Sequence, residues 1–211
     1  MRNLLIIILL AAGGYQLYSK FYMHGPSAFD DNGNPRTLIF TINGCKPCTD
    51  ASHHLKTRKI AFEEINVSEG EDQMNAAKEF GVRQYPFIIS GNLHTTGFYE
   101  SDLTGMLATV YGPGVLSIKE KKLMQDNFNA DGTAKTIMYS TQTCGYCVKA
   151  RELFNAEGVD FVELDIKKSA GAKRKFDALK GSGTPLIFIG YHRINGYNKN
   201  KILDTLKSQK I

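Results

Sequence analysis

The sequence predicts an α/β protein in which two small domains follow one another behind an apolar N-terminal segment. The first observation behind this prediction is an internal duplication. Cysteine and proline positions recur at a constant separation of 99 residues, as Cys45 and Cys144 and as Pro86 and Pro185. The second is that, in each copy, apolar runs of strand length alternate with segments of helical spacing. This period is too long for a solenoid repeat, so each copy is expected to be a domain in its own right.

Residues 1–22 are predicted to be a membrane signal anchor or a signal peptide. Arg2 precedes an apolar run over residues 4–12, which is the order of a signal sequence. We favour an uncleaved anchor, although the run is shorter than the ~20 residues of a full membrane span. Arg2 on the cytoplasmic side would place the rest of the chain outside the cytoplasm, in the periplasm if the protein is bacterial. A cleaved signal would instead give a secreted or periplasmic protein. Residues 19–36 are rich in turn formers without periodicity and predict a tether.

The duplication divides the remaining chain into a first domain (28–110), a linker (111–127) and a second domain (128–211). In each domain we expect two parallel strands joined by a helix, followed by a second helix, a hairpin and a closing helix. The predicted leading strands are 37–42, 62–67 and 87–90 in the first domain, and 136–140, 161–166 and 186–189 in the second.

Helix boundaries follow from capping residues. Gly158 is the expected C′ residue of the helix that follows Cys147. A capping box at residues 68–71 is expected to open the second helix of the first domain, and Ser169 is expected to open its counterpart. The linker is expected to contain a loop and one or two turns of basic helix.

All four cysteines belong to Cys-x-x-Cys pairs, Cys45 with Cys48 and Cys144 with Cys147. Each pair stands where an apolar strand run gives way to a helix. Backbone N–H groups and the helix dipole there favour a thiolate on the first sulfur. A disulfide across so small a loop removes little entropy from the unfolded chain, so a structural role explains the pairs poorly. Because thiolates attack disulfides, both pairs predict thiol–disulfide exchange.

Three motifs of the second domain resemble a glutaredoxin. They are Tyr139-Ser140 leading to Cys144-Gly-Tyr-Cys147, then Gly183-Thr-Pro-Leu-Ile-Phe-Ile-Gly190, and then Ile194-Asn-Gly-Tyr197. The first domain, with Cys45-Lys-Pro-Cys48, resembles a thioredoxin-like domain. The resemblance implies two tandem thioredoxin-fold domains of glutaredoxin type.

The same resemblance implies the residues of the two sites. The four cysteines would be catalytic, and Pro86 and Pro185 would follow cis peptide bonds beside them. Tyr85 and Thr184 would then offer backbone edges to an extended thiol substrate. Glutathione is the implied co-substrate, with no cofactor bound, and protein disulfides are the other implied partners. The substrate-binding residues implied are Tyr146, Thr184, Pro185, Gly196, Tyr85 and Pro86.

Other readings of the cysteines remain beside this one. A zinc site shared by the two pairs is disfavoured because their separation far exceeds the ~15–20 residues of a zinc ribbon. A c-type haem site is excluded because Thr49 and Val148 stand where histidine is required. An iron–sulfur cluster bridged through Cys144 is a minor alternative. A protein disulfide oxidoreductase or isomerase that ignores glutathione is the main one.

Charge is distributed unevenly between the two domains. Acidic side chains exceed basic ones over residues 28–110, and basic ones exceed acidic ones over 131–211. This is either a pair of solvated faces or a basic half that attracts an anionic thiol or contacts the acidic half. The basic residues are scattered and do not alternate with aromatic residues, which argues against a nucleic-acid partner.

Overall fold

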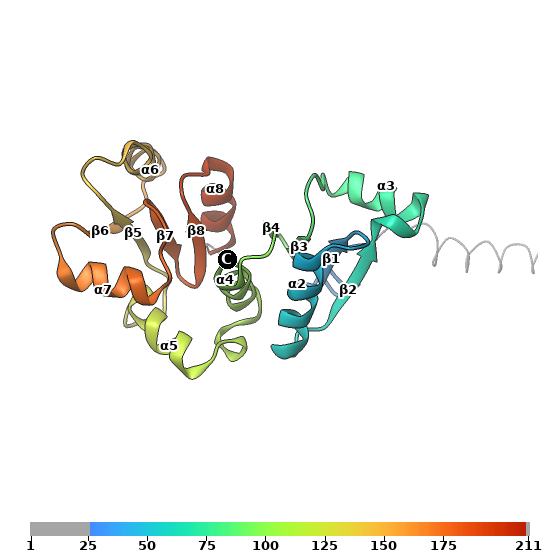
Figure 1. Ribbon diagram of the computed structural model, residues 1–211. Helices are drawn as coiled ribbons and strands as arrows, with labels where there is room; N and C mark the ends of the chain where they lie inside the picture. The colour runs from blue at the N-terminus through green and yellow to red at the C-terminus, as the bar shows by residue number, and fades with distance from the viewer. Residues whose placement is uncertain (1–25, 210–211) are drawn as a thin grey trace, which may run out of the picture.

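The computed structural model describes residues 26–209, which form two four-stranded sheets with helices on both faces (Figure 1). The first sheet has the order β2-β1-β3-β4 and the second the order β6-β5-β7-β8. The strands of the first unit are β1 (Thr37–Thr41), β2 (Phe62–Asn66), β3 (Phe87–Ser90) and β4 (Leu93–Thr96). Those of the second unit are β5 (Thr136–Ser140), β6 (Phe161–Asp165), β7 (Leu186–Ile189) and β8 (His192–Asn195). The predicted tandem α/β fold is thereby confirmed.

The central strands β1 and β5 organise the two sheets. Every residue of both strands is buried, which is why they are almost continuously apolar in sequence. Strand β1 runs parallel to β2 and antiparallel to β3, and β5 has the same relation to β6 and β7. The parallel partners therefore end at the same edge of the sheet, and the antiparallel partner begins there. In each unit, the cysteine pair lies at this end of the sheet, just after the central strand.

Helices cover both faces of each sheet and bury separate apolar clusters. In the first unit, α2 (Lys46–Thr57) and α4 (Glu100–Tyr111) cover one face and α3 (Glu71–Glu79) covers the other. In the second unit, α6 (Gly145–Ala156) and α8 (Lys199–Ser208) share a face opposite α7 (Ala170–Ala178). Helix α6 ends as predicted, with Gly158 at a positive φ of 63°.

The predicted capping box in the first unit is wrong. Residues Val67–Glu69 form a short 3-10 helix, and α3 begins after Gly70 without a side-chain cap. The Ser68 hydroxyl instead accepts a hydrogen bond of 3.1 Å from the backbone N–H of Asn43. The counterpart Ser169 does cap α7, because its Oγ accepts from the N–H of Ala172 at 3.1 Å.

Residues 28–36 belong to the first unit, so the predicted tether is wrong over this part of its length. Ala28 is buried, and Phe29 forms an isolated β-bridge with Pro35. The Phe29 ring lies against Gly91, and the second unit repeats the arrangement with Phe128. The predicted N-terminal anchor lies outside the described residues. Between residues 26 and 209, the helices are all too short or too polar to cross a membrane.

The linker contacts both units, since Leu116 and Met124 pack in the core of the second and Glu120 pairs with Arg58 of the first. It contains two 3-10 turns, Pro113–Val115 and Gln125–Asn127, on either side of helix α5 (Ile118–Met124). Ser117 and Glu120 form a capping box at the start of α5. Burial would raise the pKa of Glu120, but hydrogen bonds from Arg58 and Ser117 outweigh it and lower this pKa to about 2. The linker is thus tied to the first unit through Arg58 of the α2 C-terminus.

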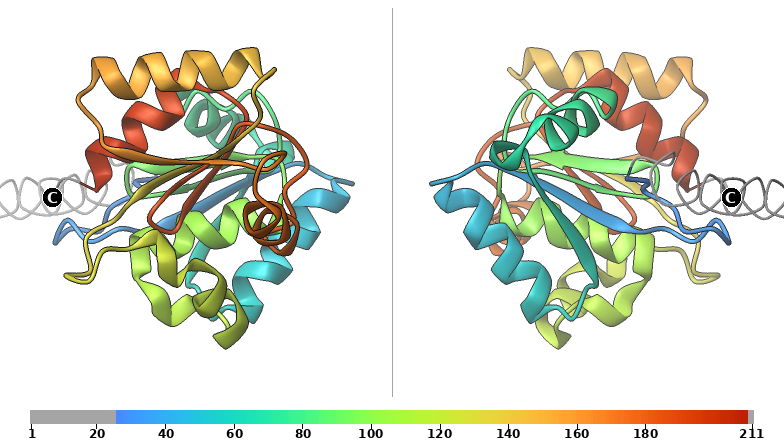
Figure 2. Two further views of the ribbon diagram at one scale, coloured as in Figure 1. Left: turned by 90° about the vertical axis from the view of Figure 1, so that its left-hand side faces the viewer. Right: turned by 90° about the vertical axis from the view of Figure 1, so that its right-hand side faces the viewer.

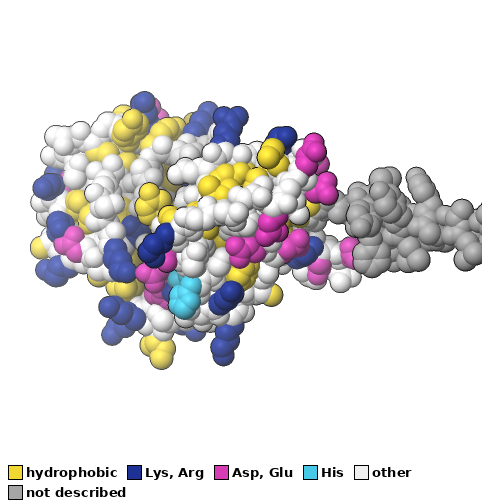
Figure 3. Space-filling view, turned by 45° about the vertical axis from the view of Figure 1, so that its right-hand side comes forward, with side chains coloured by type: hydrophobic (Ala, Val, Ile, Leu, Met, Phe, Trp, Pro, Cys, Tyr) yellow, Lys and Arg dark blue, Asp and Glu magenta, His cyan; other side chains and the backbone are white. Residues whose placement is uncertain are grey.

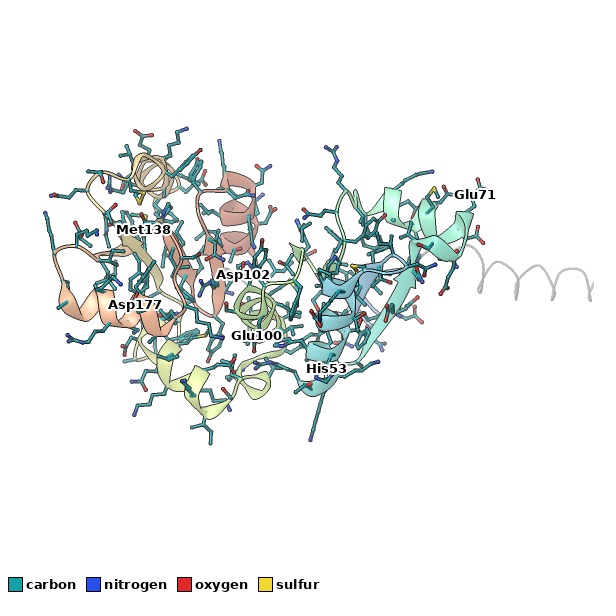
Figure 4. All side chains as sticks on the ribbon, viewed as in Figure 1. His53, Glu71, Glu100, Asp102, Met138 and Asp177 are labelled. Atoms are coloured by element: carbon teal, nitrogen blue, oxygen red, sulfur yellow. A yellow bond between two sulfur atoms is a disulfide. The ribbon has the colours of Figure 1, made fainter. Side chains whose placement is uncertain are left out.

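The two units pack against each other in a reciprocal manner. Helix α4 of the first unit lies against β8 of the second, and α8 of the second contacts β4 of the first. Both carboxylate oxygens of Asp102 in α4 accept hydrogen bonds of 2.8 Å from Nδ2 of Asn195. Asp102 also forms an ion pair with Arg193, in which Oδ1 lies 3.1 Å from Nε. Figure 4 shows Asp102 between the two units. Its side chain and that of Arg193 are 9% and 4% exposed, so this is a buried ion pair between the units.

Backbone contact is also close at this interface. A Cβ atom at Gly105 of α4 would lie 2.5 Å from the carbonyl oxygen of Tyr191. Only glycine therefore lets α4 approach β8 this closely. A polar groove of about 830 Å³ runs along the same interface, and its lining contains residues of β4, α4, β8 and α8 but no cysteine.

Candidate active site

Each Cys-x-x-Cys pair lies in the turn that joins a central strand to the following helix. The sulfurs of Cys45 and Cys48 form a disulfide, and so do those of Cys144 and Cys147. Helices α6 and α2 lie apart in the two units, with strand β8 and helix α4 between them in Figure 1, and they lie above and below the strands in Figure 2. The chain therefore presents two separate dithiol sites.

The two cysteines of each pair have unequal surroundings. Cys45 and Cys144 are the N-cap residues of α2 and α6 and are only half-buried. Cys48 and Cys147 are 3% and 0% exposed within the cores. The first sulfur of each pair is thus the one that an incoming substrate can reach.

Backbone hydrogen bonds are directed at the accessible sulfurs. The N–H of Cys48 donates to Sγ of Cys45 at 3.2 Å, and that of Cys147 donates to Sγ of Cys144 at 3.0 Å. Each of these N–H groups lies in the first turn of its helix and also donates to the carbonyl oxygen of the first cysteine, at 3.1 Å in the first unit and 3.0 Å in the second. In the reduced protein the same donors would stabilise a thiolate on the first sulfur.

A cis-proline stands beside each pair. The Tyr85–Pro86 and Thr184–Pro185 peptide bonds are both cis, as expected. Leu186 at the start of β7 pairs with Tyr139 near the end of β5, so Pro185 lies at the edge from which the Cys144 loop leaves. Phe87 and Phe40 give Pro86 the same position in the first unit.

The residues predicted to bind substrate in the second unit are partly brought together. The N–H of Gly196 donates to the carbonyl oxygen of Pro185 at 2.8 Å, and Thr184 is half-buried beside it. Tyr146 is 60% exposed in the first turn of α6, and Nζ of Lys149 lies 5.4 Å from its ring centre. Asn198 caps α8 by accepting from the N–H of Lys201 at 3.0 Å.

The first unit differs at the equivalent positions. Gly97 N–H donates to the Pro86 carbonyl at 2.8 Å, which repeats the turn of the second unit. However, the helix that follows this turn, α4, directs Glu100 and Asp102 of its first turn toward the second unit, where they pair with Lys180 and Arg193. The start of α4 is therefore engaged in the interface between the units.

The geometry does not gather the cysteines into a metal site. The four sulfurs form two disulfides, one at the start of α2 and one at the start of α6. Across residues 26–209, no group of three or more His, Cys, Asp or Glu side chains is placed to hold a metal ion.

Comparison with known proteins assigns the family. The glutaredoxin family model matches residues 37–94 and again residues 136–194, together more than half of the chain. The chain belongs to the glutaredoxin family. Glutaredoxin 3 of Escherichia coli is 39% identical over 74 residues, which are 34% of this chain and 87% of that protein. A glutaredoxin-like 8.6 kDa protein of Clostridium pasteurianum is 35% identical over 66 residues, 31% of this chain and 88% of that protein.

Among solved structures, a glutaredoxin from Archaeoglobus fulgidus aligns with 29% identity and a TM-score of 0.33, covering 36% of this chain and 90% of that one. Each of these relatives corresponds in length to about a third of the chain. Each half of this protein is thus a glutaredoxin unit, with its strand-to-helix cysteine pair and its cis-proline.

Sequence reasoning missed the residues that join the two glutaredoxin units. Asp102, Gly105 and Arg193 were not singled out, although each departs from the repeat. At the separation of 99 residues they correspond to Lys201, Asp204 and His94. A buried-strand position occupied by arginine where the first unit has histidine, and a glycine inside a helix, are the signals that could have identified the interface.

Proposed function

We propose that the protein is a thiol–disulfide oxidoreductase of glutaredoxin type that works through both cysteine pairs. The observation that carries the proposal is the asymmetry of each pair. A half-buried first sulfur receives a backbone N–H from the second cysteine, whose own sulfur is buried. Such a site lets a substrate reach one sulfur only and keeps the other for an internal reaction.

The reduced protein would act in two steps. The Cys144 thiolate attacks one sulfur of a substrate disulfide, so that a mixed disulfide forms and the other substrate sulfur leaves as a thiolate. Cys147 then loses its proton and attacks Cys144, which re-forms the internal disulfide and releases the second substrate thiolate. Two electrons pass from the dithiol to the substrate, and the released thiolates take up protons from water. Cys45 and Cys48 would act in the same way.

For the second unit we propose glutathione mixed disulfides as substrates. The exposed ring of Tyr146, the half-buried Thr184 and the Gly196 turn lie around the Cys144 edge of the sheet. An extended peptide could pair with the backbone of Thr184. A glutathione bound there would be attacked by Cys144, and a second glutathione or Cys147 would resolve the intermediate.

For the first unit we propose protein disulfides without a role for glutathione. The first turn of α4, which follows the Gly97 turn, is engaged with Lys180 and Arg193 of the second unit. In the first turn of α8, Lys199 at the position of Glu100 forms no ion pair among residues 26–209, whereas Lys201 at the position of Asp102 lines the interface groove with Asp102. Tyr85 would then receive an extended segment of a client protein beside Cys45.

We further propose that the redox units lie outside the cytoplasm on a membrane anchor. The support is the apolar run of residues 4–12 after Arg2. An impermeant thiol reagent should label the reduced cysteines as fully in cells whose cytoplasmic membrane is intact as in lysed cells; labelling only after lysis would refute this location.

Turnover of a glutathione mixed disulfide tests the proposal. The reduced protein should accelerate it, Cys144→Ser should lose the contribution of the second unit, and Cys45→Ser should change it little. Activity with insulin disulfides should depend on Cys45 as well. Retention of full activity toward both substrates when Cys45 and Cys144 are both serine would refute the assignment.

A further inference from the structure

The two glutaredoxin units carry opposite charges beside their cysteine pairs. In the first unit, β1 and β2 are parallel and end together, with Thr41 opposite Asn66. The loops that follow are joined, because Nδ2 of Asn66 donates to Oδ1 of Asn43 at 2.9 Å and the N–H of Asn43 donates to Ser68 at 3.1 Å. The start of α3 therefore lies beside the loop that leads to Cys45.

Three acidic residues stand at this position, and all are exposed. We call them the acidic rim: Glu69, Glu71 and Asp72. Glu71 is labelled in Figure 4, at the α3 end of the first unit. Figure 3 shows acidic side chains gathered on this unit, next to an apolar area.

The second unit places basic residues at the same position. Strands β5 and β6 end together, and the N–H of Ile166 donates to the carbonyl of Ser140 at 3.0 Å. Lys168 lines a small hollow together with Thr141 and Gln142, the residues that lead to Cys144. We call the exposed cations of this loop and of the first turns of α7 the basic rim: Lys167, Lys168 and Arg174.

Other charges near the sites do not cancel this difference. Lys46, between the first pair of cysteines, is neutralised by Asp50 at 2.8 Å, and Arg83 is the one further exposed cation of the loop before Pro86. In the second unit, the exposed Lys149 adds to the basic rim, whereas Asp165 accepts from the N–H groups of its own loop. Lys173 and Arg151 are paired with Asp177 and Glu163 respectively. Acidic residues thus predominate at one site and basic residues at the other.

We propose that the rims give the two dithiols opposite substrate preferences. The Cys45–Cys48 site would take disulfides flanked by cationic groups, and the Cys144–Cys147 site would take disulfides flanked by anionic groups. The inference rests on the proposed exchange activity, since each rim acts by raising the local concentration of the oppositely charged substrate at an adjacent thiolate. The chemistry at the sulfurs is the same in both units.

Two small disulfides of opposite charge test this directly. Cystamine carries two ammonium groups and 3,3′-dithiodipropionate carries two carboxylates at neutral pH. Full-length proteins with one site each are made by Cys144→Ser with Cys147→Ser, and by Cys45→Ser with Cys48→Ser. For each reduced protein, the rate with cystamine is divided by the rate with dithiodipropionate, and comparison of the two ratios cancels the intrinsic reactivity of the reagents.

The first site should give a ratio about tenfold or more above that of the second at low ionic strength. In 1 M salt the Debye length falls to ~3 Å, and the two ratios should converge. Charge reversal of a rim should invert the preference of its own site and leave the other unchanged. The reversals are Glu69→Lys, Glu71→Lys and Asp72→Lys for the acidic rim, and Lys167→Glu, Lys168→Glu and Arg174→Glu for the basic rim.

A matched control separates the rims from overall charge. Helix α5 carries three exposed lysines in the linker, and their reversal changes the net charge by as much as reversal of the basic rim. The control variant, Lys119→Glu with Lys121→Glu and Lys122→Glu, should leave both ratios within about twofold of the parent.

The outcomes distinguish this inference from the proposed function. If both single-site proteins reduce both reagents with equal ratios, or if the α5 control shifts the ratios as much as a rim does, the charge preference is refuted and the exchange activity stands. If neither protein reduces either reagent faster than a simple dithiol, the proposed function itself fails.

Discussion

Substitution of Gly105 by alanine tests the packing that joins the two glutaredoxin units. In an isolated helix this change is favourable by about 0.5–1 kcal/mol, because glycine loses more backbone entropy on folding. In α4 the new Cβ would lie 2.5 Å from the carbonyl oxygen of Tyr191 and 3.3 Å from the backbone nitrogen of Arg193. Both atoms belong to the β7–β8 hairpin of the second unit, so neither can yield as a flexible side chain would.

Relief of the contact requires α4 and β8 to separate by several tenths of an ångström, and overpacking of this kind costs about 1–3 kcal/mol. The net expectation for Gly105→Ala is a loss of about 1 kcal/mol, measured as a lower urea midpoint. Gly171→Ala in α7 is the matched control, since its nearest neighbour would be Ser169 Oγ at 3.7 Å. The control should be neutral or stabilising by up to about 0.5 kcal/mol. If Gly105→Ala proves to be as stable as Gly171→Ala or more so, the described interface is wrong.

Three further predictions concern the buried residues. Asp102→Ala should lower stability by about 3 kcal/mol in urea unfolding, because it leaves the buried Arg193 cation with neutral acceptors alone, on Leu179, Lys180 and Asn195; a loss below about 0.5 kcal/mol would contradict a buried pair. Burial lowers the pKa of His192 to about 3, so the native protein binds fewer protons than the unfolded chain below pH 6.5. Stability should therefore fall with pH from 6.5 toward 3 by up to about 1.4 kcal/mol per unit, and urea midpoints at pH 7 and 5 should differ less in His192→Leu; equal differences would count against this. Phe154→Ala, in the core beneath Cys147, should cost about 3–5 kcal/mol by the same assay, and a cost under 1 kcal/mol would show that the core is misplaced.

Local patterns in the sequence predicted the elements around the sites. Strands that are buried on both faces, such as 136–140, read as apolar runs whatever their neighbours are. The duplication allowed each ambiguous segment to be compared with its counterpart, which is how Pro86 and Pro185 were matched. Both cysteine pairs could be placed at strand-to-helix turns for the same reason.

The errors arose where a local pattern has more than one solution. Ser68 has the residue type of a cap, but its hydroxyl accepts from Asn43 in the neighbouring loop, a contact that sequence spacing does not show. Turn formers between residues 28 and 36 read as a tether because the burial of Ala28 depends on packing against the sheet. The interface of Asp102 with Arg193 joins residues from different units, and no periodicity specifies it.

The proposed exchange requires the first cysteine of each pair to be the nucleophile and the second to resolve the mixed disulfide. Trapping measures this most directly. Cys48→Ser and Cys147→Ser should each hold a disulfide-bonded substrate, with peptide mapping by mass spectrometry locating it on Cys45 or Cys144. The reciprocal variants, Cys45→Ser and Cys144→Ser, should trap none at the altered site. Substrate captured on Cys48 or Cys147 as readily as on Cys45 or Cys144 would contradict the account.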